Sequence, residues 1–347
     1  MTMKQYNVAI VGATGAVGEQ IMNTLIKRKF PIATLKLLSS ARSAGKIIYF
    51  QGQPIKVEEA RPESFEGIEV AFFSAGGSVS KQLAEAAVNR GAIVIDNTSA
   101  FRMDHHVPLV VPEVNKEDLK NHNGIIANPN CSTIQMVVAL KPLDQAFGLR
   151  KVIVSTYQAV SGAGHEAIEE LQEQASRMLS NRPYEASVLP VKGEKKHFPI
   201  AFNAIPQIDV FQDNGFTFEE IKMINETKKI MHRTDLQVAA TCVRLPIITG
   251  HSESVYIELD RNDLSVEEIK SQLLVASGVE LKDDPSNQVY PTPLDAEGKD
   301  ATFVGRIRKD LDQPNGFHLW IVSDNLLKGA ALNSVQIAES MIELELI

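Results

Sequence analysis

The sequence predicts an α/β domain with a parallel sheet, followed by an α+β domain whose sheet is mostly antiparallel. In about the first 100 residues, short apolar strands alternate with helical segments, as in parallel strands joined by crossover helices. After Leu149 the strand-like runs come in bunches, which is typical of antiparallel sheets. The length of 347 residues corresponds to about two domains.

The individual elements follow from apolar runs and from the residues that end them. In the first half we expect strands at 6–11, 34–38, 68–74 and 92–96, and helices at 19–29 and 80–90. In the second half we expect strands at 152–157, 236–243, 254–259, 303–307 and 318–322, and a final helix at 325–346. No tract of low complexity and no solenoid-type repeat interrupts this pattern.

The composition is that of an ordinary globular protein and excludes several classes. Lys and Arg total 35 against 43 for Asp and Glu, a net charge of −8, whereas nucleic-acid binders usually carry a basic excess. Two cysteines cannot form a disulfide scaffold, and no apolar stretch approaches the ~20 residues that cross a membrane. We expect a cytoplasmic protein without nucleic-acid or membrane partners, and the spacing of its side chains suggests no metal site.

A glycine-rich turn follows the first strand and opens the first helix. Its sequence is Gly12-Ala13-Thr14-Gly15-Ala16-Val17-Gly18. In a dinucleotide-binding turn, these glycines would allow a tight turn (Gly12), close approach of a pyrophosphate (Gly15) and close helix–strand packing (Gly18). The helix N-terminus would then attract the anion. A plain strand–helix turn without a ligand is the alternative interpretation.

The end of the second strand bears on which dinucleotide would bind. An NAD site usually has Asp or Glu there, on the ribose 2′-hydroxyl. This chain instead has Ser40, Arg42 and Ser43, with no carboxylate. The pattern favours NADP, with Arg42 near the 2′-phosphate, although a solvated loop arginine would look the same.

Cys131 has the setting of a nucleophile. Pro129 disfavours helix before it, so the next helix should begin at Asn130 or Cys131. A thiol in the first turn of a helix is shifted towards the thiolate by the helix dipole. Cys242 lies within a strand-like run and is expected to be a small buried apolar residue. Taken alone, Cys131 could equally be structural.

Together with other segments, these motifs resemble the aspartate-β-semialdehyde dehydrogenase family, and the resemblance covers essentially the whole chain. The segments that carry it, in order, are 12–18, 97–102, 110–115, 128–133, 157–164, 250–253 and 324–330. The ordered coincidence of so many segments is far more specific than the glycine turn alone. No catalytic position of the family is missing.

The resemblance implies a reaction and its catalytic residues. The family reduces L-aspartyl 4-phosphate reversibly with NADPH to L-aspartate 4-semialdehyde and phosphate, in the biosynthesis of lysine, diaminopimelate, threonine and methionine. Cys131 would form a thioester, which splits one difficult displacement into two easier steps. His251 would be the acid/base that manages the thiol proton, and Gln158 would orient the acyl intermediate.

The resemblance also implies how the substrate and the cofactor are held. Arg244 would bind the α-carboxylate and Glu219 the α-ammonium group. The phosphate would be bound by Arg102, Lys222, Asn130 and Ser99. Ser161, Gly162 and Asn325 would contact the cofactor, in addition to the glycine turn. An ordinary surface pair remains the alternative interpretation of Glu219 and Lys222, which are three residues apart.

The resemblance further implies the domain arrangement and assembly. The NADP-binding Rossmann domain would comprise 1–130 together with 326–347, and the catalytic and dimerisation domain 131–325. The family associates as homodimers or homotetramers, and the sheet of the second domain would be the interface. Two alternatives remain: an N-acetyl-γ-glutamyl-phosphate reductase, which uses the same cysteine chemistry, and a non-catalytic NADP-binding protein.

Overall fold

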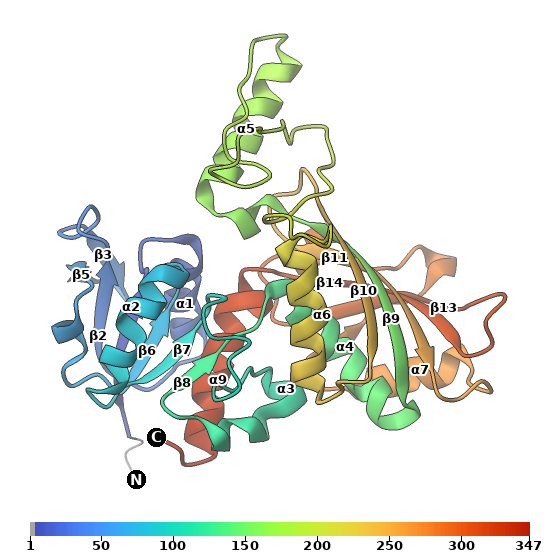
Figure 1. Cartoon of the computed structure of the whole chain (residues 1–347), viewed down its shortest axis with the longest axis horizontal. Coiled ribbons are helices and arrows are strands. Elements are labelled where there is room, and N and C mark those ends of the chain that lie inside the picture. Colours follow the sequence, from blue (N-terminus) through green and yellow to red (C-terminus); the bar gives the residue numbers. More distant parts are fainter. Residues whose placement is uncertain (1–3) are drawn as a thin grey trace. The chain divides into compact units, whose positions relative to one another are not determined.

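The computed structural model describes residues 4–347, which form two compact units (Figure 1). The first unit runs to Asn130 and includes Ala330–Ile347 at the other end of the chain. The second unit is Cys131–Gly329. Each unit has its own six-stranded sheet and is described separately below.

The sheet of the first unit is entirely parallel, in the strand order β5-β2-β1-β6-β7-β8. Its strands are β1 (Tyr6–Val11), β2 (Ile32–Ser39), β5 (Glu58–Glu59), β6 (Val70–Phe73), β7 (Ile93–Asp96) and β8 (Ile125–Ala127). The helices of this unit include α1 (Ala16–Lys27), α2 (Gly77–Val88) and α9 (Leu332–Glu343). All four residues of β6 are buried, as expected for a strand covered by helices on both faces. The predicted parallel sheet is therefore confirmed.

The strand order indicates where a ligand would bind to this unit. From β1 the chain builds outward on one side through β2 and β5, and then returns to the other side through β6, β7 and β8. Ligands bind at such a reversal point, beyond the carboxyl ends of the strands. The glycine-rich turn follows β1 and therefore lies at this point.

Several short elements of the first unit were not predicted. They are the strands β5 and β8, the hairpin β3 (Ile47–Phe50) and β4 (Gln53–Lys56), the helix α3 (Pro112–Asn115), and the 3-10 turns η1 (Pro62–Phe65) and η2 (Lys116–Asn121). Only β5 among the unpredicted elements bears on the ligand groove, because Glu59 pairs with Ser39 at the end of β2.

The second unit contains a mixed sheet in the order β10-β9-β11-β14-β13-β12. Its strands are β9 (Leu149–Gln158), β10 (Gln237–Arg244), β11 (His251–Leu259), β12 (Val279–Leu281), β13 (Thr302–Lys309) and β14 (Gly316–Ser323). The inner pairs are antiparallel, whereas β10–β9 and β12–β13 are parallel. The predicted mostly antiparallel sheet is confirmed, with parallel pairs at its two edges.

Helices cover the inner face of this sheet. They are α4 (Cys131–Phe147), α6 (Phe218–Met231) and α7 (Val266–Leu274), and α4 packs on β11 and β14 (Figure 1). Helix α5 (His165–Leu179) stands away from the sheet with the segment that follows it, and it has its own small apolar core. Short turns η3 (Val160–Ala163) and η4 (Pro285–Asn287) and helix α8 (Pro293–Ala296) complete the unit.

The strand register shows which side chains lie in the same row across the inner face of the second sheet. Arg244 pairs with Gln158, and His251 pairs with Ser323 on the far side of β11. Paired residues point to the same face, so these side chains lie in one row at the end of the sheet. One step further in, Thr156 pairs with both Cys242 and Glu253.

The predicted final helix is wrong over its first turns. Residues Leu327–Ala331 form a π-helical turn (η5), and regular α-helix begins only at Leu332. Asp324 accepts hydrogen bonds from the backbone N–H groups of Leu326 and Leu327, which caps a turn before the helix. An apolar periodicity near 3.6 residues does not reveal such a wide turn, and π-turns are frequent at functional sites.

Candidate active site

In the glycine turn of the first unit, each of the three glycines has a different physical reason to lack a side chain. Gly12 has φ +92°, and an added Cβ would lie 2.8 Å from the carbonyl carbon of Ser74. At Gly18 a Cβ would lie 2.3 Å from the oxygen of Gly12. At Gly15, however, a Cβ would meet nothing closer than 3.5 Å, and φ is −95°. Protein packing thus requires Gly12 and Gly18, while Gly15 leaves space for a ligand.

The backbone N–H groups at the end of this turn, where α1 begins, have no side-chain cap. Gly15 is the N-cap of α1 and offers no side-chain acceptor to the first turn, which begins at Ala16 and Val17. Thr14 and Ser39 share a hydrogen bond of 3.0 Å between their hydroxyl oxygens at the rim. A groove of about 520 Å³ opens here, lined by Gly12, Thr14, Gly15, Ser40, Glu59 and Ser74 among others. Uncapped backbone N–H groups at a helix start fit a pyrophosphate.

The turn after β2 carries the residues expected at the ribose. Ser40 and Arg42 are exposed, whereas Ser43 is buried and donates its backbone N–H to the Ser40 carbonyl. Sequence reasoning missed Glu59, which β5 brings next to Ser39 and into the groove. Arg61 donates to the Glu59 carboxylate from Nε at 3.0 Å. Glu59 is therefore already paired with a cation, which limits its use as a ribose acceptor.

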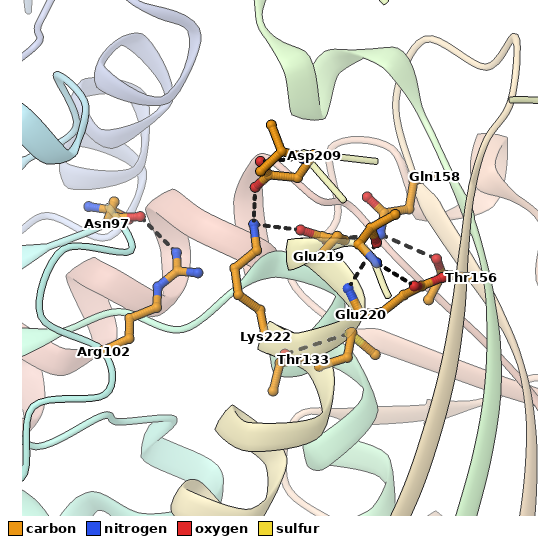
Figure 2. Close-up of polar contacts among 12 residues, drawn as sticks. Asn97, Arg102, Thr133, Thr156, Gln158, Asp209, Glu219, Glu220 and Lys222 are labelled. Carbon is orange, nitrogen blue, oxygen red and sulfur yellow. Dashed lines mark hydrogen bonds and ion pairs between the residues drawn. The ribbon is translucent and has the colours of Figure 1, made fainter. Parts of the chain in front are cut away.

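Arg102 and its neighbours lie in the loops beyond β7 and β8. The Arg102 side chain is buried and donates from Nε to the Asn128 carbonyl at 2.9 Å. From Nη2 it donates to the Asn97 carbonyl, also at 2.9 Å, and Figure 2 shows these two residues side by side. Asn130 is buried, whereas Ser99 is exposed. The two carbonyls fix the plane of the guanidinium group without neutralising its charge.

Cys131 is the first residue of α4, as Pro129 predicts. The thiol side chain is half-buried, and Gly329 lies against it, since a Cβ on Gly329 would be 2.7 Å from the Cβ of Cys131. Arg244 interacts electrostatically with Cys131. Cys242, in contrast, is fully buried, and desolvation raises the pKa of its thiol. The two cysteines therefore differ as expected, one at a helix start near a cation and one in the core.

Arg244 and His251 meet around Gly162. A Cβ on Gly162 would lie 3.0 Å from Arg244 Nη1 and 3.3 Å from His251 Nε2. Both side chains are buried, and neither Arg244 Nε nor His251 Nε2 has a hydrogen-bond partner among residues 4–347. Buried donors without partners are costly, and they indicate a site that a polar ligand completes.

The backbone of Ala159 holds both groups. Its N–H donates to His251 Nδ1 at 3.1 Å, and its carbonyl accepts from Arg244 Nη1 at 2.7 Å. Burial and the nearby Arg244 charge lower the pKa of His251 to about 3. The imidazole is therefore neutral, and because Nδ1 accepts a hydrogen bond, its proton is on Nε2.

A hydrogen-bonded chain connects Gln158 to Lys222 (Figure 2). Gln158 donates from Nε2 to Glu219 Oε1 at 3.0 Å and to the Thr156 hydroxyl at 3.2 Å. Lys222 is paired with Glu219 at 2.7 Å and with Asp209 at 3.1 Å. Glu219 is buried, so this is no ordinary surface pair. Asp209 lies ten residues before Glu219, outside any motif, and no sequence pattern indicates its role.

Local capping places Glu219 in this chain. Thr217 caps α6 by accepting from the Glu220 N–H, and the Glu220 carboxylate accepts from the Thr217 N–H at 2.8 Å. Glu220 also accepts from the backbone N–H of Cys242 at 3.1 Å. This contact ties the start of α6 to β10, two residues before Arg244.

Ser161 and Asn325 also lie in the second unit. Asn325 donates from Nδ2 to the Ser161 hydroxyl at 2.9 Å, and its Oδ1 accepts from the Gly250 N–H at 2.9 Å. Gly250 directly precedes His251, so Asn325 links the His251 strand to the turn at Gly162. Both residues were predicted as cofactor contacts, and these internal hydrogen bonds give them a positioning role as well.

Within the part of the chain that the structure describes, neither a metal-binding cluster nor a membrane-spanning helix is present. Residues 4–347 contain no group of three His, Cys, Asp or Glu side chains able to hold a metal ion. Nor does any helix in this range combine the length and apolar character needed to span a bilayer.

Comparison with known proteins identifies relatives over nearly the full length. Residues 7–122 match the family "Semialdehyde dehydrogenase, NAD binding domain" and residues 140–328 match "Semialdehyde dehydrogenase, dimerisation domain". The chain is 70% identical to the aspartate-semialdehyde dehydrogenase of Bacillus subtilis, over 98% of this chain and 99% of the relative. It is 52% identical to that of Aquifex aeolicus, over 97% and 98%.

Solved structures agree. Aspartate semialdehyde dehydrogenase II from Vibrio cholerae, complexed with ASA, matches with a TM-score of 0.93 at 45% identity, over 98% of this chain and 99% of that one. The Candida albicans enzyme with NADP matches with a TM-score of 0.77 at 26% identity, over 99% and 100%.

Proposed function

This chain belongs to the aspartate-semialdehyde dehydrogenase family, and from that premise we propose how its own residues carry out the reaction. The proposed reaction is the reversible, NADP-dependent conversion of L-aspartyl 4-phosphate to L-aspartate 4-semialdehyde and phosphate. The observation that carries it is a buried guanidinium group, Arg244, with an unpartnered donor beside His251 and in the field of Glu219.

The substrate's amino-acid end matches the charges in this pocket. Arg244 binds the α-carboxylate, since a guanidinium group can donate two parallel hydrogen bonds to it. Glu219 accepts the α-ammonium group, and its ion pair with Lys222 positions its carboxylate for this contact. An N-acetylated substrate has no ammonium charge, so Glu219 favours aspartyl phosphate over the N-acetylglutamyl analogue.

Cationic and polar groups serve the phosphate. Lys222 and Arg102 supply positive charge, and Asn130 and Ser99 supply hydrogen-bond donors. Arg102 is preorganised because two carbonyls already hold its guanidinium group. Preorganised donors lose little free energy to rearrangement when charge develops on the leaving group.

Cys131 carries the covalent chemistry. Its thiolate attacks the acyl carbon, the bond from that carbon to the phosphate oxygen breaks, and phosphate leaves with the electron pair. The product is a thioester on Cys131, and Gln158 is the residue that orients this acyl intermediate. When bound, the nicotinamide supplies the hydride that reduces the acyl group. The bond from carbon to the Cys131 sulfur then breaks, which releases the aldehyde and regenerates the thiolate.

His251 acts as a hydrogen-bond donor in the resting tautomer. Its Nε2–H stabilises the oxygen that becomes negatively charged when the acyl carbon is attacked. The Ala159 N–H keeps the ring in this orientation. In this tautomer Nε2 already carries a proton. It must donate that proton before it can accept another, so His251 acts as an acid before it acts as a base.

We propose NADP rather than NAD as the cofactor. Gly15 and the uncapped start of α1 fit the pyrophosphate, and Gly12, Thr14, Ala16, Val17 and Gly18 shape the same turn. Arg42 stands near the expected 2′-phosphate, with Ser40 and Ser43 as hydrogen-bonding neighbours. Ser161, Gly162 and Asn325 are proposed to contact the nicotinamide end.

We also propose a homodimer formed through the outer face of the second sheet, in the cytoplasm. That face exposes Ile153 and carries Tyr157 against Trp320, with ring centroids 5.5 Å apart. Replacing Ile153 by Glu is expected to yield monomers in sedimentation analysis. A dimer or a tetramer that persists in this variant would contradict the proposed interface.

The test of the proposed reaction is phosphate-dependent NADP reduction. Purified protein with aspartate semialdehyde should reduce NADP over many turnovers only when phosphate is present. N-acetylglutamate semialdehyde should support at most about 1% of that rate, because Glu219 would be left without its ammonium partner. Comparable rates with both aldehydes would favour the N-acetyl-γ-glutamyl-phosphate reductase, and no turnover with either would favour a non-catalytic NADP-binding protein.

A further inference from the structure

Glu253 is a fully buried carboxyl group that none of the roles above uses. It lies on β11 two residues after His251, so both side chains are on the inner face of the sheet. Its neighbours in the row are Thr156 and Ile321. Neither Glu253 oxygen has a hydrogen-bond donor in good geometry within residues 4–347.

Gln135 connects the helix of the proposed nucleophile to this strand. It lies on α4 four residues after Cys131, and residues at this spacing share a helix face. Its Nε2 donates to the backbone carbonyl of His251 at 3.3 Å. Its Oε1 is buried without a donor, and its amide interacts with the Glu253 carboxyl. Three buried oxygens, two of Glu253 and one of Gln135, therefore share the need for a proton.

A proton on Glu253 satisfies two of these three oxygens. Burial raises the pKa of Glu253 well above its usual value and outweighs the hydrogen bond from Gln135, which lowers this pKa, while the Glu219 charge on α6 acts in the same direction as burial. The other titratable groups that face it are Cys242 on β10, which is kept as the thiol, and His251, which is neutral. Arg244 is held by the Ala159 carbonyl and interacts electrostatically with Glu219. As a neutral acid, Glu253 can donate its O–H to Gln135 Oε1.

We propose that Gln135 and neutral Glu253 form a clamp between α4 and β11 that fixes the separation of Cys131 from His251. This clamp consists of two hydrogen bonds in series, from Glu253 to Gln135 and from Gln135 to the His251 carbonyl. Both are positioning residues, because they act through Cys131 and His251 and not on substrate. The proposal rests on the catalytic roles proposed for those two residues.

Stability alone does not account for a carboxyl group at this position. An apolar side chain of similar size would remove both carboxyl oxygens from the core, and such replacements of buried polar or charged groups are often neutral or stabilising. A small misplacement of reacting groups, however, lowers rates strongly. The clamp therefore predicts a variant that folds at least as well as the wild type and yet turns over more slowly.

The test compares Glu253→Gln, Glu253→Met and Gln135→Met with the double variant. Glu253→Gln keeps a neutral donor and should retain kcat within about three-fold. Each Met variant should lower kcat by about 30-fold, in line with the cost of small misplacement. The KM for semialdehyde should change less than about three-fold, because Arg244 and Glu219 are intact. The double variant should be no slower than Gln135→Met alone, because both changes break the same clamp. Thermal unfolding of the Met variants should occur at or above the wild-type temperature.

Glu170→Gln is the matched control, because Glu170 is a buried carboxylate of the same unit bonded to the Ser187 and Val188 N–H groups, away from the pocket. It should lower stability and leave kcat unchanged. Wild-type kcat in both Met variants, or a loss in Glu253→Gln as large as in Glu253→Met, would overturn the clamp. Multiplied losses in the double variant would do the same. The variant Cys131→Ala distinguishes a failure of the proposed catalytic chemistry from a failure of the clamp. If Cys131→Ala keeps its activity, the proposed chemistry is wrong. If it is inactive while the Met variants have wild-type kcat, only the clamp is wrong.

Discussion

The two units build their sites in different ways. In the first, the ligand groove is made largely of backbone: a turn whose glycines permit close approach, and a helix start without a cap. In the second, the candidate site is made of buried charged and polar side chains, among them Arg244, His251 and Glu219. A backbone site depends on a short local motif, whereas a side-chain site depends on which strands pair and in which register.

The two sites also differ in the free-energy cost that their polar groups carry when no ligand is bound. Backbone N–H groups at a helix end remain satisfied by water when no ligand is bound. Buried groups such as Arg244 Nε have no such partner and carry a standing desolvation cost. We therefore expect changes in the pocket to affect turnover far more than changes in the groove, and changes in the groove to act on cofactor affinity.

The largest expected effect is that of Cys131→Ala. Without the thiol no thioester can form, so phosphate-dependent NADPH formation should fall by at least about 10⁴-fold. NADPH binding, measured by fluorescence titration, should stay within about two-fold because the groove is unchanged. Retained turnover would remove Cys131 from the chemistry.

Arg244→Lys should have the next largest effect. Lysine keeps the positive charge but cannot form the two parallel hydrogen bonds, so kcat/KM for semialdehyde should fall by about 100-fold. NADP affinity should be unchanged. Steady-state kinetics with varied semialdehyde would measure this, and a fall in NADP affinity of similar size would contradict the assignment.

The pH dependence of stability should report His251. Its pKa of about 3 in the folded state lies below its ordinary 6.5, so between these values the unfolded chain binds more protons. Stability is therefore lost as the pH falls below about 6.5, by about 2 kcal/mol at pH 5. In His251→Gln, the difference in unfolding free energy between pH 7.5 and pH 5 should shrink by about that amount. Urea titrations at the two pH values test this, and an unchanged difference would show that the imidazole is not buried as the neutral form.

Arg42→Glu tests the groove by charge. The substitution places a negative charge near the expected 2′-phosphate, so the KM for NADP should rise about 20-fold more than that for NAD. The matched change is Glu59→Gln, which leaves Arg61 without its carboxylate partner and should not weaken NADP. Equal losses for both cofactors in Arg42→Glu would exclude Arg42 from 2′-phosphate binding.

The smallest effect separates two glycines of one turn. Gly15→Ala should leave the thermal unfolding temperature nearly unchanged and weaken NADP about five-fold, since its Cβ would project into the ligand space. Gly18→Ala should instead destabilise the fold, because its Cβ would collide with the Gly12 oxygen. Destabilisation by both substitutions would show that packing, and not a ligand, requires Gly15.

The features that could be predicted from the sequence are those that depend on local motifs, as the groove of the first unit does. Those that depend on strand pairing could not be predicted. The glycine turn, the helix start at Cys131 and the burial of Cys242 depend on neighbouring residues, and the structure has each of these local features as predicted. Glu59 and Asp209 could not be found, because strand pairing and an ion pair bring them beside residues distant in sequence. The Ala159 backbone likewise gives no sequence signal, although it holds Arg244 and His251. The π-helical turn at Leu327–Ala331 was missed because its apolar pattern resembles that of an α-helix.

The most direct test of the proposed chemistry is a single-turnover experiment without phosphate. Wild-type protein mixed with NADP and aspartate semialdehyde should produce a rapid burst of one NADPH per active site and then almost stop. Mass spectrometry should find the aspartyl group on the peptide that contains Cys131, and added phosphate should release it. A steady rate without phosphate, or an acyl group on any residue other than Cys131, would contradict the proposed mechanism.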